Sequence, residues 1–175
     1  MILLSLGRPE EGLTATKEAV EACRDLAARW PDTFLPDLAR SMTNLGMTLL
    51  RLDRPEEALA ASEEAVEAYR DLAASRPDTY LPDLARSLSA IANALAALGR
   101  HEEATSTAAE ALSILVPFVE RYPRYFGDLA QGVGSDLLRH RKAAGMEADP
   151  ALLERIARAR LAREPRAVPP LPGPG

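Results

Sequence analysis

The sequence is poor in several residue types, and each scarcity excludes a class of protein. Among its 175 residues there is one cysteine, Cys23, which excludes an internal disulfide and any multi-cysteine metal site. Aromatic residues make up only 5% of the chain, whereas sandwiches and barrels are built from aromatic and β-branched strands. No apolar run approaches about 18 residues, the length needed to span a bilayer. The net charge of -5 disfavours nucleic acid as a partner.

Alanine and leucine are abundant instead, with 32 and 27 residues. Both lose little side-chain freedom in a helix, so this composition favours an all-α protein. The 14 prolines and 10 glycines punctuate the chain and mark candidate helix ends. The sequence therefore predicts several helices that are separated by short turns.

A short segment returns at a fixed interval of 46 residues. It is LGRPEE at residues 6–11, LDRPEE at 52–57 and LGRHEE at 98–103. Residues 6–51 and 52–97 are identical at 28 of 46 positions. A repeat of this kind predicts a stack of similar units rather than one closed core.

Each period is predicted to form two antiparallel helices, because apolar residues recur every three or four positions. Between Pro82 and Leu98 these residues are Leu84, Leu88, Ile91 and Leu95. Gly99 suits a left-handed helix cap, and a second helix is expected to begin within two residues of it. Neither helix buries its apolar face alone, so neighbouring pairs must stack into a solenoid.

The second helix of each pair is expected to be long. The first such helix is predicted over Pro9–Arg29, and the next one continues to Ala74 and ends before Pro77. A connection through Asp78 and Thr79 is then expected to lead into the following pair.

The pattern of large and small residues resembles the tetratricopeptide repeat family. One period matches the family's pattern at Leu45, Gly46, Leu49, Ala58 and Ala65, and the next at Ile91, Ala92, Leu95, Ala104 and Ala111. The usual period of the family is 34 residues, and the longer period here resembles the extended repeats of kinesin light chain and of bacterial signalling proteins. The resemblance implies a right-handed α-solenoid of antiparallel pairs, each made of a helix A and a helix B.

The repeat array is expected to occupy residues 1–144. Its predicted repeats cover residues 1–35, 36–81, 82–126 and, in part, 127–144. Met1–Leu6 is interpreted as the tail of a truncated first helix A, either at a fragment boundary or where another segment or subunit covers the next helix. Residues 145–163 are predicted to form a capping helix, and the proline- and glycine-rich residues 164–175 to be disordered.

No ensemble of acid, base and nucleophile emerges, so no enzyme activity, cofactor or metal is expected. His101 at a turn and His140 in a basic run are interpreted as ordinary surface histidines, because neither has a partner at ligand spacing. Cys23 replaces Tyr69 at the same repeat position and is interpreted as a small packed residue.

The resemblance places a binding groove along the helices A. Positions beside the core stripe are predicted to line it: Arg40, Thr43, Asn44, Met47, Arg51, Arg86, Ser89, Asn93 and Gln131, with Ala97, Leu138 and Lys142 continuing the row. Arginine and asparagine there can hold a carboxylate or a peptide backbone. In the alternative interpretation, Arg40 and Arg86 pair with Asp37 and Asp83 along their own helices.

These features predict a non-catalytic module in the cytoplasm that binds a peptide or a partner domain, as a scaffold or sensor within a larger bacterial signalling protein. The alternative is a structural spacer that associates with itself through its incomplete N-terminal end. An RNA-binding helical repeat is a third interpretation, which the acidic body of the chain disfavours. No membrane contact is expected.

Overall fold

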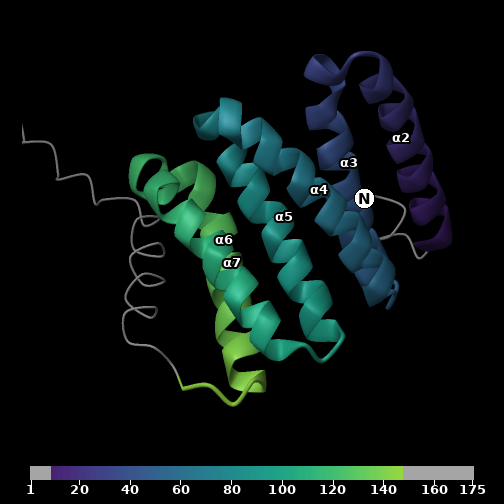
Figure 1. Ribbon diagram of the computed structural model, residues 1–175. Helices are drawn as coiled ribbons and strands as arrows, with labels where there is room; N and C mark the ends of the chain where they lie inside the picture. Colours follow the sequence, from purple (N-terminus) through teal and green to yellow (C-terminus); the bar gives the residue numbers. More distant parts are fainter. Residues whose placement is uncertain (1–8, 148–175) are drawn as a thin grey trace, which may run out of the picture.

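The computed structural model of the protein describes residues 9–147, and all the regular structure in this range is α-helical (Figure 1). Six helices of 21 residues follow one another: α2 (Pro9–Arg29), α3 (Pro31–Arg51), α4 (Pro55–Ser75), α5 (Pro77–Ala97), α6 (His101–Arg121) and α7 (Pro123–Ala143). Each helix packs against the next in chain order. The predicted all-α stack of helix pairs is therefore confirmed, with α3, α5 and α7 as helices A and α2, α4 and α6 as helices B.

Three predictions fall on parts of the chain outside the described residues. They are the helix tail at residues 1–6, the part of the predicted capping helix at 148–163 and the disordered tail at 164–175. The first three residues of that predicted capping helix, 145–147, are described and are not helical. Within the described range, the first long helix has the predicted bounds. None of the helices in this range is long and apolar enough to cross a membrane.

The junctions from helix B to helix A are shorter than predicted. A single residue, Trp30, Arg76 or Tyr122, separates the two helices, with φ of -138° to -137° and ψ of 64° to 72°. Each junction residue precedes a proline, which disfavours a helical conformation before it and fits well at the first position of a helix. The predicted connection through Asp78 and Thr79 is wrong, because both residues lie in the first turn of α5.

Two predicted repeat boundaries fall inside helices for a related reason. Residues 36 and 82 are prolines at the sixth position of α3 and α5. A proline there lacks one backbone N–H and disturbs only the start of the helix, so the helix begins before it. Helix α7 likewise begins at Pro123, four residues before the predicted partial repeat.

The turns that follow the helices A repeat one backbone conformation at intervals of 46 residues. Asp53, Gly99 and Gly145 have positive φ angles of 57°, 76° and 69°. The residue after each donates its backbone N–H to a carbonyl five positions earlier, in the pairs Arg54–Leu49, Arg100–Leu95 and Met146–Arg141. The left-handed cap predicted at Gly99 is confirmed, and the third copy shows that the period reaches residue 146.

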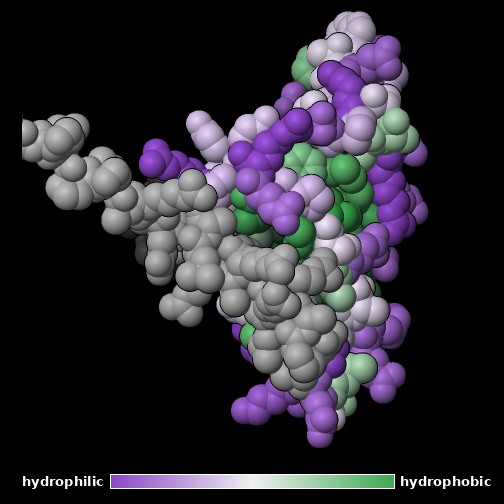
Figure 2. Space-filling model, turned by 90° about the vertical axis from the view of Figure 1, so that its left-hand side faces the viewer, coloured by the Kyte–Doolittle hydropathy of each residue, from purple (hydrophilic) through white to green (hydrophobic). Residues whose placement is uncertain are grey.

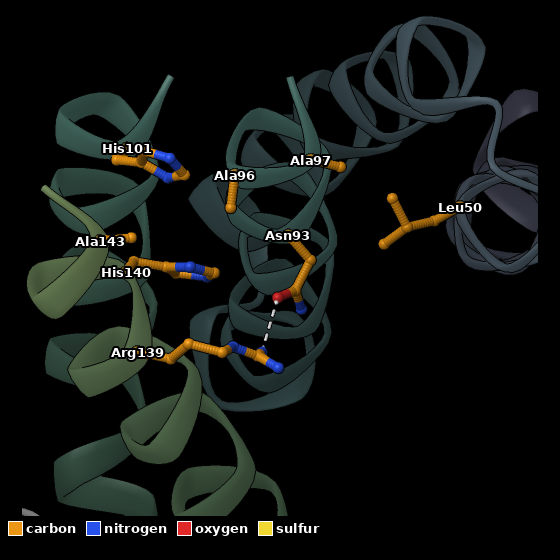
Figure 3. Close-up of a pocket in the computed structure, with 8 residues that line it drawn as sticks. All are labelled: Leu50, Asn93, Ala96, Ala97, His101, Arg139, His140 and Ala143. Atoms are coloured by element: carbon orange, nitrogen blue, oxygen red, sulfur yellow. Dashed lines mark hydrogen bonds between the residues drawn. The ribbon is translucent and has the colours of Figure 1, made fainter. Parts of the chain in front are cut away.

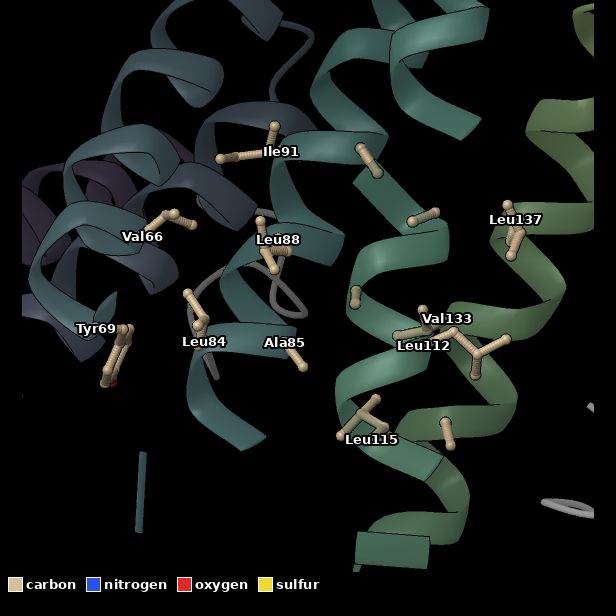
Figure 4. Packing of buried hydrophobic residues seen from close by; sticks show 14 of the residues in the cluster. Val66, Tyr69, Leu84, Ala85, Leu88, Ile91, Leu112, Leu115, Val133 and Leu137 are labelled. Atoms are coloured by element: carbon tan, nitrogen blue, oxygen red, sulfur yellow. The ribbon is translucent and has the colours of Figure 1, made fainter. Parts of the chain in front are cut away.

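The core lies between the helices A and B (Figure 4). The four apolar residues predicted to form the buried stripe of α5 are each less than a tenth exposed: Leu84, Leu88, Ile91 and Leu95. Across the next two helices, Leu112, Leu115 and Leu137 are fully buried. Burying one such side chain stabilises the fold by about 1.5–3 kcal/mol, so the stack is held chiefly by these contacts.

Small residues set the spacing between a helix A and its helix B. A Cβ atom placed on Gly46 would lie 2.3 Å from Oγ of Ser62 and 3.1 Å from the carbonyl oxygen of Ala58. In the next pair, Ala92 and Ala108 occupy the positions of Gly46 and Ser62. The contact between helix A and helix B is therefore filled by a glycine and a serine in one repeat and by two alanines in the next.

The helices A also contact one another, α3 with α5 and α5 with α7. Among the described helices B no two backbones approach as closely, so α2, α4 and α6 lie further apart and long side chains reach from one to the next. A stack whose layers differ in this way curves toward the closer layer. We therefore call the surface formed by α3, α5 and α7 the inner face, and that formed by α2, α4 and α6 the outer face.

Ion pairs bridge the outer face at the interval of the repeat. Arg24 of α2 donates to Glu64 of α4 at 2.9 Å, and Arg70 of α4 reaches Glu110 of α6 at 3.5 Å. All four side chains are about half exposed to solvent, so water screens the attraction between their charges. These pairs are part of a solvated outer surface and contribute little to stability.

Candidate functional site

On α3, the predicted binding residues divide into exposed and buried positions. Arg40, Asn44, Met47 and Arg51 are exposed. Thr43 is only 3% exposed, and its hydroxyl bonds to the carbonyl oxygen of its own helix and to Ser87 of α5. The structure therefore places Thr43 in the joint between α3 and α5 rather than on the surface.

On α5, the predicted residues face the neighbouring helix A as much as solvent. Asn93 is half-buried, and its Nδ2 donates to Oδ2 of Asp136 on α7 at 2.9 Å. Its Oδ1 accepts a hydrogen bond from Nη2 of Arg139 at 3.4 Å. Ser89 on α5 and Gln131 on α7 are also half-buried. Asn93 thus links α5 to α7 and stands at the edge of the inner face.

The two arginines in the predicted row are paired along their own helices. Arg40 donates to Asp37 at 2.5 Å, and Arg86 lies 3.9 Å from Asp83. The structure therefore shows the alternative that the sequence left open for these arginines. Both side chains remain at least half exposed, so a ligand can still reach their guanidinium groups.

A pocket of about 630 Å³ opens on the inner face between α3, α5 and α7, next to the start of α6 (Figure 3). Its apolar lining comes from Leu50, Ala96, Ala97 and Ala143, and its polar lining from Asn93, His101, Arg139 and His140. Four helices from successive repeats, α3, α5, α6 and α7, supply this lining. The pocket is therefore formed by the stacking of repeats and by no single repeat.

The structure corrects the interpretation of the two histidines as ordinary surface residues. His140 is 2% exposed, His101 is half-buried, and both imidazoles point from α6 and α7 toward α5 across the pocket (Figure 3). Neither Nδ1 of His101 nor Nε2 of His140 has a hydrogen-bond partner among the described residues. His140 lies 46 residues after the fully buried Ala94, so counting the repeat to α7 would have predicted its burial.

The protonation of His140 is set by its surroundings. Burial lowers the pKa of the imidazole, and the positive charge of the neighbouring Arg139 lowers it further. Asp136 acts in the opposite direction, but the net effect keeps the pKa below the ordinary value of about 6.5. His140 is therefore neutral near pH 7 and can either donate or accept a hydrogen bond at Nε2.

Positive charge gathers beside the pocket. Arg139 carries its side chain into the lining, where one nitrogen, Nη2, bonds to Asp136 and Asn93. Arg51 follows Leu50 on α3, and Lys142 precedes Ala143 on α7. In the described part of the chain neither Arg51 nor Lys142 has an ion-pair partner, so both can attract an acidic ligand.

The end of the stack at α6 and α7 also shows apolar surface. Figure 2 views the molecule from this side, and apolar side chains lie there between hydrophilic ones. Tyr122 and Tyr125, at the start of α7, are 47% and 82% exposed.

Within the described residues no group of three His, Cys, Asp or Glu side chains is placed to hold a metal ion.

Comparison with known proteins identifies the repeat. Residues 1–71 match the sequence model of the family described as tetratricopeptide repeat. The match includes α2, α3 and most of α4, and the same 46-residue geometry continues beyond it to residue 146. Among curated proteins, none matches the chain.

Proposed function

Because residues 1–71 match the tetratricopeptide repeat family, which generally mediates protein–protein interaction, we propose that the chain binds a peptide segment of a partner protein on its inner face. The single observation that carries the proposal is the pocket walled by α3, α5 and α7. A surface that several repeats build together is where a solenoid offers a continuous binding site.

The exposed side chains of α3 supply the chemistry for an extended segment. Asn44 carries both a donor and two acceptor positions for a peptide backbone, and Arg51 offers a cation without an ion-pair partner among the described residues. Met47, which is 36% exposed, adds a flexible apolar contact between them. These three residues lead along α3 toward Leu50 at the edge of the pocket.

The cellular role extends the same proposal. The 46-residue repeats resemble those of bacterial signalling proteins, which supports a scaffold or sensor in a larger assembly of the cytoplasm. No catalytic family matches the chain, and we propose that it acts by binding alone. Its partner is then a protein segment that carries acidic and apolar residues, since these complement Arg51, Arg139 and the apolar lining.

A peptide-display selection with the purified 175-residue chain tests this function. The tightest peptides are measured by fluorescence anisotropy against the chain and its variants. We expect Asn44→Ala and Arg51→Ala each to weaken binding by about fivefold to tenfold, because each removes one hydrogen-bonding group. The matched control is Glu67→Ala on α4, an exposed residue of a helix B, which should leave the affinity unchanged. Equal affinity of all variants, or no selected peptide, would refute the proposal.

A second candidate function, self-association as a spacer, is favoured by a specific feature of α2. Ala15 and Ala19 are exposed, whereas their counterparts Ala61 and Ala65 on α4 are buried. No described helix covers this face of α2 as α3 covers the same face of α4. Analytical ultracentrifugation decides this candidate: a strictly monomeric chain at about 50 μM removes it.

A further inference from the structure

Two histidines that line the inner-face pocket each have a buried nitrogen atom without a hydrogen-bond partner among the described residues. Nε2 of His140 belongs to a side chain that is 2% exposed, and it has no hydrogen bond within the described chain. Nδ1 of His101, at the start of α6, is also a buried atom without a hydrogen-bond partner in the described chain. Buried polar atoms nearly always have a hydrogen-bond partner in folded proteins. Two such nitrogen atoms without a partner, beside an open pocket, therefore point to a ligand that hydrogen-bonds to them.

The free groups around the pocket are chiefly hydrogen-bond donors. Arg139 uses only Nη2 in its bonds to Asp136 and Asn93, which leaves Nε and Nη1 without a partner among the described residues. Nδ2 of Asn93 is already engaged by Asp136. A neutral imidazole can present N–H at Nε2, so His140 can act as a further donor. An oxygen ligand with several lone pairs fits such a set better than a cation does.

We propose that this pocket receives the side-chain carboxylate of a glutamate or aspartate within the bound segment, held by Arg139 and His140, and this rests on the peptide-binding function proposed above. Arg139 supplies charge-assisted hydrogen bonds, which are the strong ones for carboxylates. His101 adds a donor from the start of α6.

The shape of the lining supports a residue inside a segment. Leu50 lies on one side of the donors and Ala143 on the other, while Ala96 and Ala97 line the α5 side (Figure 3). A volume of about 630 Å³ has room for an acidic side chain together with its neighbours in the peptide. The apolar lining packs against the methylene groups of the acidic residue, which excludes water from its hydrogen bonds.

Binding of the carboxylate is coupled to a proton. The charged or titratable groups that face His140 are Arg139 and Asp136 on its own helix and His101 on α6, and α5 contributes only the neutral Asn93. In the free protein the pKa of His140 lies below its ordinary value because of burial and Arg139. A bound carboxylate favours the charged imidazolium, so it raises this pKa and a proton is taken up. Affinity therefore rises as the pH falls from about 7.5 to about 6.

The chain has only two histidines, so proton NMR of the imidazole C2–H signals reads the pocket directly. The probe is N-acetylglutamate α-amide, added to the whole 175-residue chain, and the control is N-acetylglutamine α-amide. We expect the acid to raise the titration midpoint of His140 by about one pH unit and the glutamine compound to leave it in place. A midpoint that stays fixed at about 50 mM acid, or that moves equally with both compounds, overturns the proposal. A larger effect of N-acetylalanine, with its terminal carboxylate, overturns the assignment to a side chain.

A variant and its matched control test the role of Arg139. Arg139→Gln should weaken the binding of N-acetylglutamate α-amide by about tenfold, because it removes the charge-assisted bonds. Arg124→Gln, at an exposed position in the first turn of the same helix, should leave the affinity unchanged. Far-UV circular dichroism checks that both variants are folded. If a variant does not fold, the NMR titration of the wild-type chain with the acid and the glutamine compound still tests the proposal. Equal affinity of Arg139→Gln and the wild type contradicts the proposal.

The two proposals can fail separately. If selected peptides bind on the inner face but show neither a preferred acidic residue nor a pH dependence, the carboxylate site is wrong and the peptide-binding function stands. If the acid probe shifts His140 while no peptide binds the chain, the pocket is real and the peptide-binding function is wrong.

Discussion

The helix pairs α2–α3 and α4–α5 are near copies in sequence, yet they are buried to different degrees. Their segments share 28 of 46 residues. Ala61 and Ala65 of α4 are 6% and 0% exposed, whereas Ala15 and Ala19 at the same positions of α2 are exposed. Helix α4 packs between α3 and α5, whereas among the described helices the backbone of α2 lies close to that of α3 alone. Position in the stack therefore decides how much a given residue contributes, and identical residues offer matched tests of this.

The largest effect is expected from a buried leucine that both pairs contain. Leu72 of α4 is 7% exposed, and its counterpart Leu26 of α2 is only half-buried. We expect Leu72→Ala to lower the free energy of unfolding by about 2–4 kcal/mol, because it leaves a cavity in the core. Leu26→Ala should cost less than half as much. Urea denaturation followed by circular dichroism measures both, and equal losses would show that the position in the stack does not matter.

The contact between Gly46 and Ser62 gives the next effect. Gly46→Ala should destabilise the chain by about 1–3 kcal/mol, since the new Cβ lies 2.3 Å from Oγ of Ser62 and overpacks the contact. The double variant Gly46→Ala with Ser62→Ala recreates the pair that Ala92 and Ala108 form one repeat later, so most of the stability should return. Ser62→Ala alone should be neutral or stabilising, because its buried hydroxyl has no partner among the described residues. Additive effects in this denaturation cycle would contradict the account of the contact.

A pH-dependent effect distinguishes α7 from α5, because His140 replaces the buried Ala94. The unfolded imidazole, with a pKa of about 6.5, binds a proton more readily than the folded one, whose pKa is lowered by burial and Arg139. Stability from this site is therefore complete above about pH 7 and is lost as the pH falls through the unfolded pKa toward the folded one. Melting temperatures from pH 7.5 to 5 should fall more steeply for the wild type than for His140→Ala. If the melting temperatures of the wild type and of His140→Ala fall equally with pH, the burial of His140 does not lower its pKa as described.

The smallest effect is expected on the outer face. Arg24→Gln should cost less than about 1 kcal/mol, because its pair with Glu64 is exposed to solvent. Arg70→Gln should cost still less, since its distance to Glu110 is 3.5 Å rather than 2.9 Å. Both costs should vanish in about 1 M salt, which screens exposed charges. Denaturation at low and high salt measures the difference, and a salt-independent loss would indicate a role in packing.

The sequence predicted the fold from its period because each repeat carries its own helix signals. The buried stripe of α5 at Leu84 and Leu88 and the cap at Gly99 follow from local spacing and backbone preference. The helix starts were less predictable, because Pro36 and Pro82 suggest a boundary but are tolerated at the sixth position of a helix.

The candidate site was only partly predictable from sequence. Exposure of Asn44 and Met47 follows from their place beside the apolar stripe of α3. The bond from Thr43 to Ser87 and the pocket that contains His101 and His140 depend on contacts between different repeats. Such contacts arise from how the helices stack, and spacing within one helix does not report them.

The most direct test of the central claim, that the helices A form the binding face, is amide NMR mapping with the tightest selected peptide. The ¹⁵N-labelled chain is titrated, and each amide shift is assigned to a helix. We predict that the shifts cluster on α3, α5 and α7 around Met47, Asn93 and Arg139, while exposed residues of α4 such as Glu67 do not change. Shifts concentrated on α2, α4 and α6 would contradict the account.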